Sequence, residues 1–144
     1  MTISTVLASK GVKVVTMRPE QTIREALALL AQHNIGVVVV TAGEGRPAGI
    51  VSERDVVRTL ARDERVFDWP VSRIMTRDVI VGSPADDLAT VGHTMTEKHI
   101  RHLPVMDGGK LVGIVSIGDI VKTQRDRYQG EVDTLQTQLF QSHP

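Results

Sequence analysis

The residues with the clearest chemical potential are a serine and an aspartate three positions apart, and this pair occurs twice. Gly49-Ile50-Val51-Ser52 precedes Asp55, and Gly113-Ile114-Val115-Ser116 precedes Asp119. Each serine ends an apolar run and can begin a helix, where free backbone N–H groups and the helix dipole accept a phosphate. A carboxylate in the first turn can accept two hydrogen bonds from a vicinal diol, the group that a ribose presents. The pattern therefore suggests a ribonucleotide pocket.

The same residues also have a purely structural explanation. A serine before a helix, with an aspartate three positions later, is a variant of the capping box, and an acidic side chain stabilises a first turn without any ligand. A duplicated fold duplicates its helix caps. The second copy therefore does not decide between a cap and a binding site.

The serine–aspartate pair belongs to a longer internal repeat. The two copies lie 64 positions apart, and the match continues with Val57 and Val121. Upstream, Pro19 matches Pro84 at an offset of 65, because one residue is missing from the intervening turn. A repeat of this length indicates two halves of similar fold, which we expect to share one core.

Each half has the pattern β-α-β-β-α. In the first half we expect strands at 12–17, 37–40 and 48–51, and helices from a capping box at Thr22 and from Ser52 to Leu60. In the second half we expect strands at 79–81, 102–106 and 111–115, and helices at 86–98 and from about 117. Residues 71–76 should form one helical turn between the halves.

Composition excludes several classes of function. The chain has 144 residues, 17 basic and 17 acidic side chains, five histidines and no cysteine. Without cysteine there is no disulfide, thiolate nucleophile or cysteine-ligated metal. Zero net charge argues against a general nucleic-acid binder. No apolar run reaches the ~20 residues that cross a bilayer, and the N-terminus lacks a secretory signal pattern, so we expect a soluble cytoplasmic protein.

Other motifs favour neither catalysis nor metal binding. The sequence contains no P-loop, no HExxH motif and no nucleophile elbow, so we expect no enzymatic activity. His93, His99 and His102 are only loosely compatible with one face, and no nearby carboxylate completes a ligand set, so we expect no metal. The arginines at 54, 58, 62 and 65 are interrupted by acidic residues and indicate a solvated helix face rather than a nucleic-acid surface.

The C-terminal part is polar but carries a short apolar pattern. Tyr128, Val132, Leu135 and Leu139 are spaced four, three and four residues apart, which is typical of a coiled-coil seam of under two heptads. Such a seam is too short to be stable alone. Contact with a partner subunit is the first expectation, with packing on its own domain and a frayed end as alternatives.

Together these residues resemble a tandem pair of cystathionine-β-synthase-type (CBS) domains. The features that carry the resemblance are Met75-Thr76, the stretch Ile-Arg-His-Leu-Pro-Val from residue 100, and the repeated Gly-Ile-Val-Ser-x-x-Asp. The run from Gly108 to Lys122 is typical of small stand-alone bacterial members. The resemblance spans residues 10–124.

The resemblance implies a mixed α/β (α+β) module of two β-α-β-β-α repeats related by a pseudo-two-fold axis. The expected division is an N-terminal segment at 1–10, the first repeat at 11–62, a linker at 63–77, the second repeat at 78–124 and a C-terminal helical tail at 125–144. The family implies a homodimer that senses an adenine nucleotide and reports to a downstream protein that remains unknown. AMP is the expected ligand, with ADP, ATP or NAD(H) as alternatives. The competing hypothesis is a dimerising scaffold with empty clefts.

The resemblance also assigns residues to two clefts. In one cleft Asp119 would bind the ribose, with Ser116 and Gly118 near the phosphate. The other members implied for this cleft are Lys13 and Val15 of the first strand, an adenine wall of Ile35, Gly36 and Val37, and Arg101 and His102 near phosphate. In the other cleft Asp55 would bind the ribose. The other members implied for that cleft are Ser52, Arg54, Thr76, Asp78, Ile80 and Ile100.

The two halves differ where a phosphate would bind. Arg101, His102 and Pro104 of the second half correspond to Gly36, Val37 and Val39 of the first. Positive charge is therefore unequal between the clefts. We expect the Asp119 cleft to bind slightly better, because Lys13 adds a cation there, although Arg54 supplies an anion partner to the other.

Overall fold

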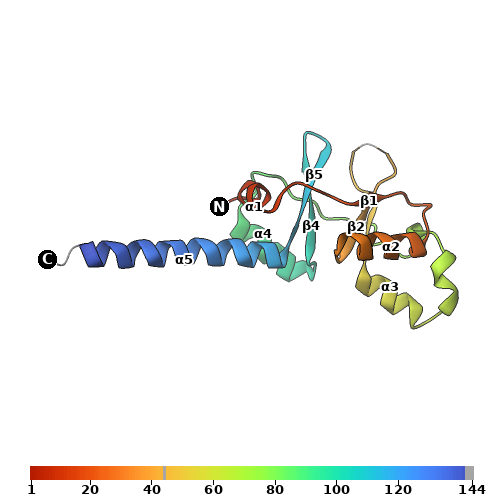
Figure 1. Ribbon diagram of the computed structural model, residues 1–144. Coiled ribbons are helices and arrows are strands. Elements are labelled where there is room, and N and C mark those ends of the chain that lie inside the picture. Colours follow the sequence, from red (N-terminus) through yellow and green to blue (C-terminus); the bar gives the residue numbers. More distant parts are fainter. Residues whose placement is uncertain (44, 142–144) are drawn as a thin grey trace.

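The structure is a computed structural model that describes residues 1–43 and 45–141, and it contains two similar halves side by side (Figure 1). The first half holds β1 (Thr16–Met17), α2 (Ile23–His33), β2 (Val37–Val40), β3 (Gly49–Ser52) and α3 (Glu53–Leu60). Two 3-10 turns follow, η1 (Glu64–Asp68) and η2 (Val71–Arg73). The second half holds α4 (Leu88–Lys98), β4 (His102–Asp107), β5 (Lys110–Ser116) and α5 (Ile117–Gln141), while α1 (Ile3–Lys10) opens the chain.

The first half forms a three-stranded sheet in the order β1-β2-β3. β1 is parallel to β2 and β2 is antiparallel to β3, and all four residues of β2 are buried. The capping box predicted at Thr22 is confirmed, because the Glu25 N–H donates to Thr22 Oγ1 at 3.2 Å and the Thr22 N–H donates to Glu25 Oε2 at 3.2 Å. The first strand is shorter than the predicted 12–17, because the chain before Thr16 spans the gap between the halves.

The second half retains only part of this sheet. β4 and β5 form an antiparallel pair, but the strand predicted at 79–81 is wrong. Only Gly82 makes a parallel bridge, to Val105. Three residues earlier, the carbonyl of Val79 accepts a hydrogen bond from Arg46 Nη2 at 3.2 Å instead of pairing with a strand. The residues before Gly82 therefore lie outside the sheet.

Helix α1 packs against the second half rather than the first. Ile3, Val6 and Leu7 are buried in the core that β4, β5, α4 and the start of α5 provide. The backbone is docked as well, because the Ile3 N–H donates to the Asp86 carbonyl at 3.0 Å. The N-terminal segment, expected to be separate from the repeats, is thus part of the second hydrophobic core.

The linker completes the first half in the same way. The Val71 N–H donates to the Gln21 carbonyl at 2.8 Å, and Val66, Val71 and Met75 are buried in the first core. Each half is therefore closed by the segment that precedes the other half in the chain. Most buried residues form two clusters, one per half, so the prediction of a single shared core is wrong. Val37, Val39 and Val79 are buried as well but belong to neither cluster.

Helix α5 extends far beyond the body of the molecule (Figure 1). It runs without a break from Ile117 to Gln141, and almost every side chain after Gln124 is exposed. A frayed end is therefore wrong up to Gln141, and packing on its own domain is wrong for the distal turns. Among the described helices, none is both long and apolar enough to span a bilayer.

Candidate functional site

Both serine–aspartate pairs cap helices, as the structural explanation predicted. The Ser52 N–H donates to Asp55 Oδ2 at 2.9 Å and the Asp55 N–H donates to Ser52 Oγ at 3.2 Å. Ser116 and Asp119 repeat the arrangement at 2.9 and 3.0 Å. In both aspartates the described hydrogen bonds use Oδ2 alone. The cap therefore leaves Oδ1 able to accept a hydrogen bond from a ligand, and capping does not exclude binding.

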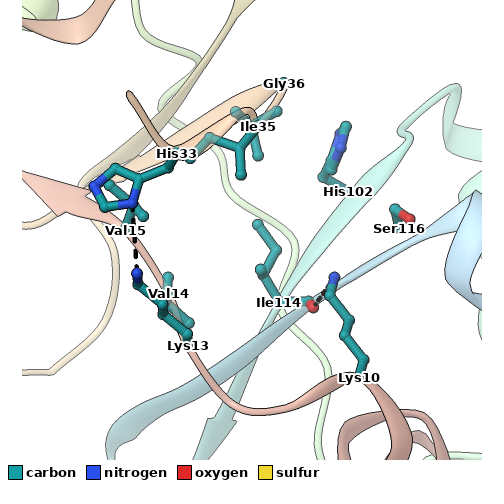
Figure 2. Close-up of a pocket in the computed structure, with 11 residues that line it drawn as sticks. Lys10, Lys13, Val14, Val15, His33, Ile35, Gly36, His102, Ile114 and Ser116 are labelled. Carbon is teal, nitrogen blue, oxygen red and sulfur yellow. Dashed lines mark hydrogen bonds between the residues drawn. The ribbon is translucent and has the colours of Figure 1, made fainter. Parts of the chain in front are cut away.

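A cavity of about 300 Å³ lies between the two halves, and we call it the first cleft. Asp119 is not among its lining residues, but it is hydrogen-bonded to two that are, Lys10 and Ser116. Figure 2 shows Lys13 and His33 on one wall, and His102, Ser116 and Lys10 on the other. The residues predicted for this cleft that do line it are Lys13, Val15, Ile35, Gly36, Val37, His102 and Ser116. The structure thus joins residues from both halves around one cavity of ligand size.

Lys10 is the main residue of the first cleft that sequence reasoning missed. Its Nζ donates to Asp119 Oδ2 at 2.5 Å and to the Ile114 carbonyl at 2.9 Å. In the other half the backbone N–H of Thr76 fills the corresponding place, donating to the Ile50 carbonyl at 2.9 Å. The first cleft therefore has an additional cation, which comes from α1, the N-terminal helix that packs against the second half.

The charged groups of the first cleft shift one another's pKa values. Burial alone raises the pKa of the Asp119 carboxyl, but hydrogen bonds from Lys10 and from the Ser116 N–H lower it below its usual value. Burial lowers the pKa of His102 below 6.5, and the nearby charge of Lys10 lowers it further, while Asp119 opposes the shift. At neutral pH Asp119 is therefore ionised and His102 is neutral.

A second cleft, of about 410 Å³, adjoins Asp55. The residues predicted for it that do line it are Ser52, Arg54, Asp55, Thr76 and Ile100. Three arginines, Arg54, Arg58 and Arg101, also line it, together with Glu53 and His99. The second cleft therefore has an arginine-rich wall, which suits an anion.

Some predicted residues lie elsewhere. Asp78 and Ile80 line a separate cavity, because residues 78–81 form no strand that would carry them to the edge of the second cleft. Arg101 lines the second cleft rather than the first. Pro104 is buried within β4 and Gly118 is exposed in the first turn of α5, and neither is among the lining residues of the two clefts.

The two clefts meet at three residues. Gly36, Val37 and His102 line both of them. Gly36 has no side chain, and nothing lies within 4 Å of where its Cβ would be, so no side chain fills the space beside it. His102 thus lines both clefts.

Comparison with known families decides the assignment. The family model of the CBS domain matches the chain twice, at residues 7–62 and 71–126. This chain belongs to the CBS-domain family. A CBS domain-containing protein of Bacillus subtilis, YhcV, is 35% identical over 84% of this chain and 86% of its own length. The mixed α/β fold with two repeats is therefore that of a CBS pair.

Solved CBS structures show the same architecture. The CBS-domain protein ATU1752 from Agrobacterium tumefaciens has a TM-score of 0.82 at 38% identity, covering 86% of this chain and 99% of its own. PAE2072 from Pyrobaculum aerophilum, complexed with AMP, has a TM-score of 0.73 at 31% identity and covers 83% and 89%. The CBS pair of MJ0100, complexed with 5′-methylthioadenosine and S-adenosylmethionine, has a TM-score of 0.78 at 26% identity and covers 88% and 98%. PAE2072 and MJ0100 thus each bind an adenosine-containing ligand.

The histidines do not assemble into a metal site in the described part of the chain. No group of three or more histidine, aspartate or glutamate side chains there is close enough to hold an ion. His93 instead pairs with Glu97 on the surface of α4, at 3.2 Å. The clefts gather basic side chains instead, Lys10 and Lys13 in the first and Arg54, Arg58 and Arg101 in the second.

Proposed function

We propose that this CBS pair is a regulatory sensor that binds an adenine nucleotide through its phosphate, with the first cleft as the main site. The observation that carries the proposal is that one cavity unites Lys13 and His102 with Ser116 and the neighbouring Asp119. Two CBS pairs of the same fold bind AMP or S-adenosylmethionine and 5′-methylthioadenosine, which supports an adenosine-type ligand.

The charge of the first cleft favours a phosphorylated ligand. Lys10, Lys13, His33 and His102 line it, and among the described residues that line it none is acidic, while the neighbouring Asp119 is already paired with Lys10. A cationic ligand such as S-adenosylmethionine would meet the ammonium group of Lys13, whose charge Asp119 does not compensate. An anionic nucleotide would meet favourable charges. AMP is therefore the proposed ligand, and ATP or NAD(H) would use the same phosphate contacts.

The proposed roles follow from the positions around the cleft. Asp119 Oδ1 would accept hydrogen bonds from the ribose, and Ser116 lies beside it. Val15, Ile35 and Val37 would form the apolar wall for adenine. Lys13 and His102 would bind the phosphate. The second cleft would use Asp55 and Ser52 in the same way, with the phosphate on Arg54 and Arg101.

A ligand in the first cleft would report by population shift. The cavity is lined by β2 and the segment before β1 from the first half, and by β4 and β5 from the second. A bound nucleotide would therefore stabilise one orientation of the halves over others. A downstream protein that prefers this orientation would read the nucleotide concentration. Such a role is regulatory rather than catalytic, and the cytoplasm is the compartment proposed for it.

Isothermal titration calorimetry of the full chain tests the proposal. We expect AMP to bind with a Kd in the micromolar range, and adenosine and S-adenosylmethionine to bind at least ~10-fold more weakly, because they lack the phosphate contacts. ATP and NAD(H) complete the panel. Nucleotide-free protein that binds none of these compounds would contradict the proposal and favour the scaffold hypothesis. Tighter binding of S-adenosylmethionine than of AMP would contradict the charge argument.

Binding of AMP should also depend on pH through His102. Its pKa is lowered in the free protein, so the side chain is neutral at pH 7. A phosphate beside it favours the charged form and raises its pKa, so binding takes up a proton and affinity rises as the pH falls. Between pH 8 and pH 6 we expect the affinity to rise by more in the wild type than in His102→Gln. The variant is the control for the titration of the phosphate itself, and equal pH profiles would place His102 outside the phosphate contact.

A further inference from the structure

Lys10 brings a charge to the first cleft from α1, the helix that packs against the second half. Its Nζ donates to Asp119 Oδ2 and to the Ile114 carbonyl, and Figure 2 shows the side chain extended towards Ile114. The side chains of Lys10 and Asp119 are only 34% and 25% exposed. Water and salt screen such a partly buried pair much less than a surface pair. Lys10 therefore compensates the charge of Asp119 beside the cleft.

The second cleft has no equivalent of this ion pair. There the Ile50 carbonyl, which corresponds to that of Ile114, accepts from the backbone N–H of Thr76. In the part of the chain that the structure describes, no ion pair involves Asp55. The same carbonyl is thus satisfied by a neutral backbone group in one half and by a charged side chain in the other.

This ion pair determines the net charge that a ligand meets in the first cleft. Lys10 and Lys13 line the cleft, and Asp119 adjoins it. While Lys10 compensates Asp119, the positive charge of Lys13 is left over. Without Lys10, the charges of Asp119 and Lys13 would cancel. One side chain therefore decides whether these groups make the cleft positive or neutral.

The charge at the 5′ position of an adenosine compound is sensitive to this difference. AMP has an anionic phosphate there, S-adenosylmethionine has a cationic sulfonium, and 5′-methylthioadenosine has a neutral thioether. With the ribose on Asp119 Oδ1, as proposed above, each 5′ group lies near the same charges. At an effective dielectric constant of ~30, one unit charge ~8 Å away changes affinity by about 10-fold.

We propose that Lys10 is the specificity-determining residue of the first cleft, because its ion pair with Asp119 makes the cleft select an anionic 5′ group over a cationic one. The inference rests on the proposed function, since it requires an adenosine ligand in this cleft. Lys10 acts here through the charge of Asp119, whereas Lys13 is the lysine proposed to bind the phosphate itself.

Calorimetry of Lys10→Met with the three compounds tests the proposal. Methionine retains most of the length of the lysine stem and removes its charge. The buried residues Ile3, Val6 and Leu7 hold α1 in place, so the variant should fold. We expect AMP to bind about 10-fold more weakly than to the wild type, and S-adenosylmethionine about 10-fold more tightly. The affinity of 5′-methylthioadenosine should change less than either.

Two further variants separate charge from structure. Lys10→Arg keeps the positive charge and should retain the wild-type preference for AMP. Lys110→Met is the matched control, because Lys110 is exposed, lines neither cleft and lies six residues along β5 from Ser116. That separation is about 20 Å, so Lys110→Met should change none of the three affinities.

The ratio of the AMP and S-adenosylmethionine affinities decides the outcome. If Lys10→Met weakened all three compounds equally, Lys10 would only support the structure of the cleft, and the proposal would be overturned. An unchanged ratio in a protein that binds AMP would overturn it as well, while leaving the proposed function intact. A wild type that binds none of the compounds would contradict the proposed function, and this inference with it.

A titration without ligand measures the charge of Lys10 separately from nucleotide binding. Burial lowers the pKa of His102, the charges of Lys10 and Arg101 lower it further, and the charge of Asp119 raises it. NMR titration of the His102 ring should therefore give a higher pKa in Lys10→Met than in the wild type, and the wild-type pKa in Lys110→Met. An unchanged pKa in Lys10→Met would show that its charge does not reach the cleft, which would overturn the proposal even if AMP binds.

Discussion

Replacing Asp119 with alanine should weaken AMP binding by about 1.5–3 kcal/mol, or roughly 10- to 150-fold, since charge-assisted hydrogen bonds to the ribose would be lost. Asp55→Ala is the matched variant, because Asp55 makes the same cap in the other half. If the first cleft is the main site, Asp55→Ala should change AMP affinity much less. Calorimetry of both variants measures the difference.

The capping role of both aspartates complicates this comparison in a predictable way. Each alanine variant loses a helix cap, which costs about 1 kcal/mol of the free energy of unfolding. The Asp119→Ala variant also loses the hydrogen bond that Lys10 donates to this carboxylate. Asp119→Asn retains an acceptor for the Ser116 N–H but not the charge, so it separates the cap from the ligand contact. Equal AMP affinity in Asp119→Ala and the wild type would show that Asp119 only caps the helix.

Replacing Ile3 with alanine should destabilise the protein by about 2–5 kcal/mol, the usual cost of truncating a large buried aliphatic side chain. Ile3 is fully buried, although it is only three residues from the N-terminus. Its Cδ1 lies 2.9 Å from the ideal Cβ position of Gly82, which shows how closely α1 approaches the second half. Denaturant unfolding measures the loss.

Val12→Ala is the control for this measurement. Val12 is also an aliphatic residue near the N-terminus, but it is 64% exposed and should change the free energy of unfolding by less than about 0.5 kcal/mol. Val71→Ala, in the segment that closes the first half, should be destabilising like Ile3→Ala, because Val71 is fully buried. If Ile3→Ala were no more destabilising than Val12→Ala, the N-terminal helix would not be part of the second core.

The sequence contains a short repeat that relates α1 to the linker around Val71, the two segments that each close one half. Sequence reasoning alone did not identify it. Ile3-Ser4 and Val71-Ser72 are 68 positions apart, and Leu7 and Met75 continue the match. In the structure Leu7 packs against Gly113 and Met75 packs against Gly49, the two glycines that begin the repeated Gly-Ile-Val-Ser motif. A short match with its own offset is hard to distinguish from chance before the contacts are known.

The candidate site shows where local pattern is sufficient and where it fails. Ser52, Asp55, Ser116 and Asp119 were predictable, because a strand end, a cap and a first helical turn are local features. Asp78 and Ile80 were placed by symmetry with the first strand, and they lie elsewhere because the corresponding strand does not form. Symmetry of sequence thus did not ensure symmetry of hydrogen bonding.

The sequence by itself determined the duplicated β-α-β-β-α pattern, the helix caps and the family, because these depend on residues close together in the chain. Only the tertiary structure showed that Lys10 joins Asp119, that His102 faces both clefts, and that each half is closed by the segment preceding the other. These features arise from contacts between residues as far apart as Lys10 and Asp119. Such contacts depend on how two separate cores are placed side by side, and no local spacing encodes that placement.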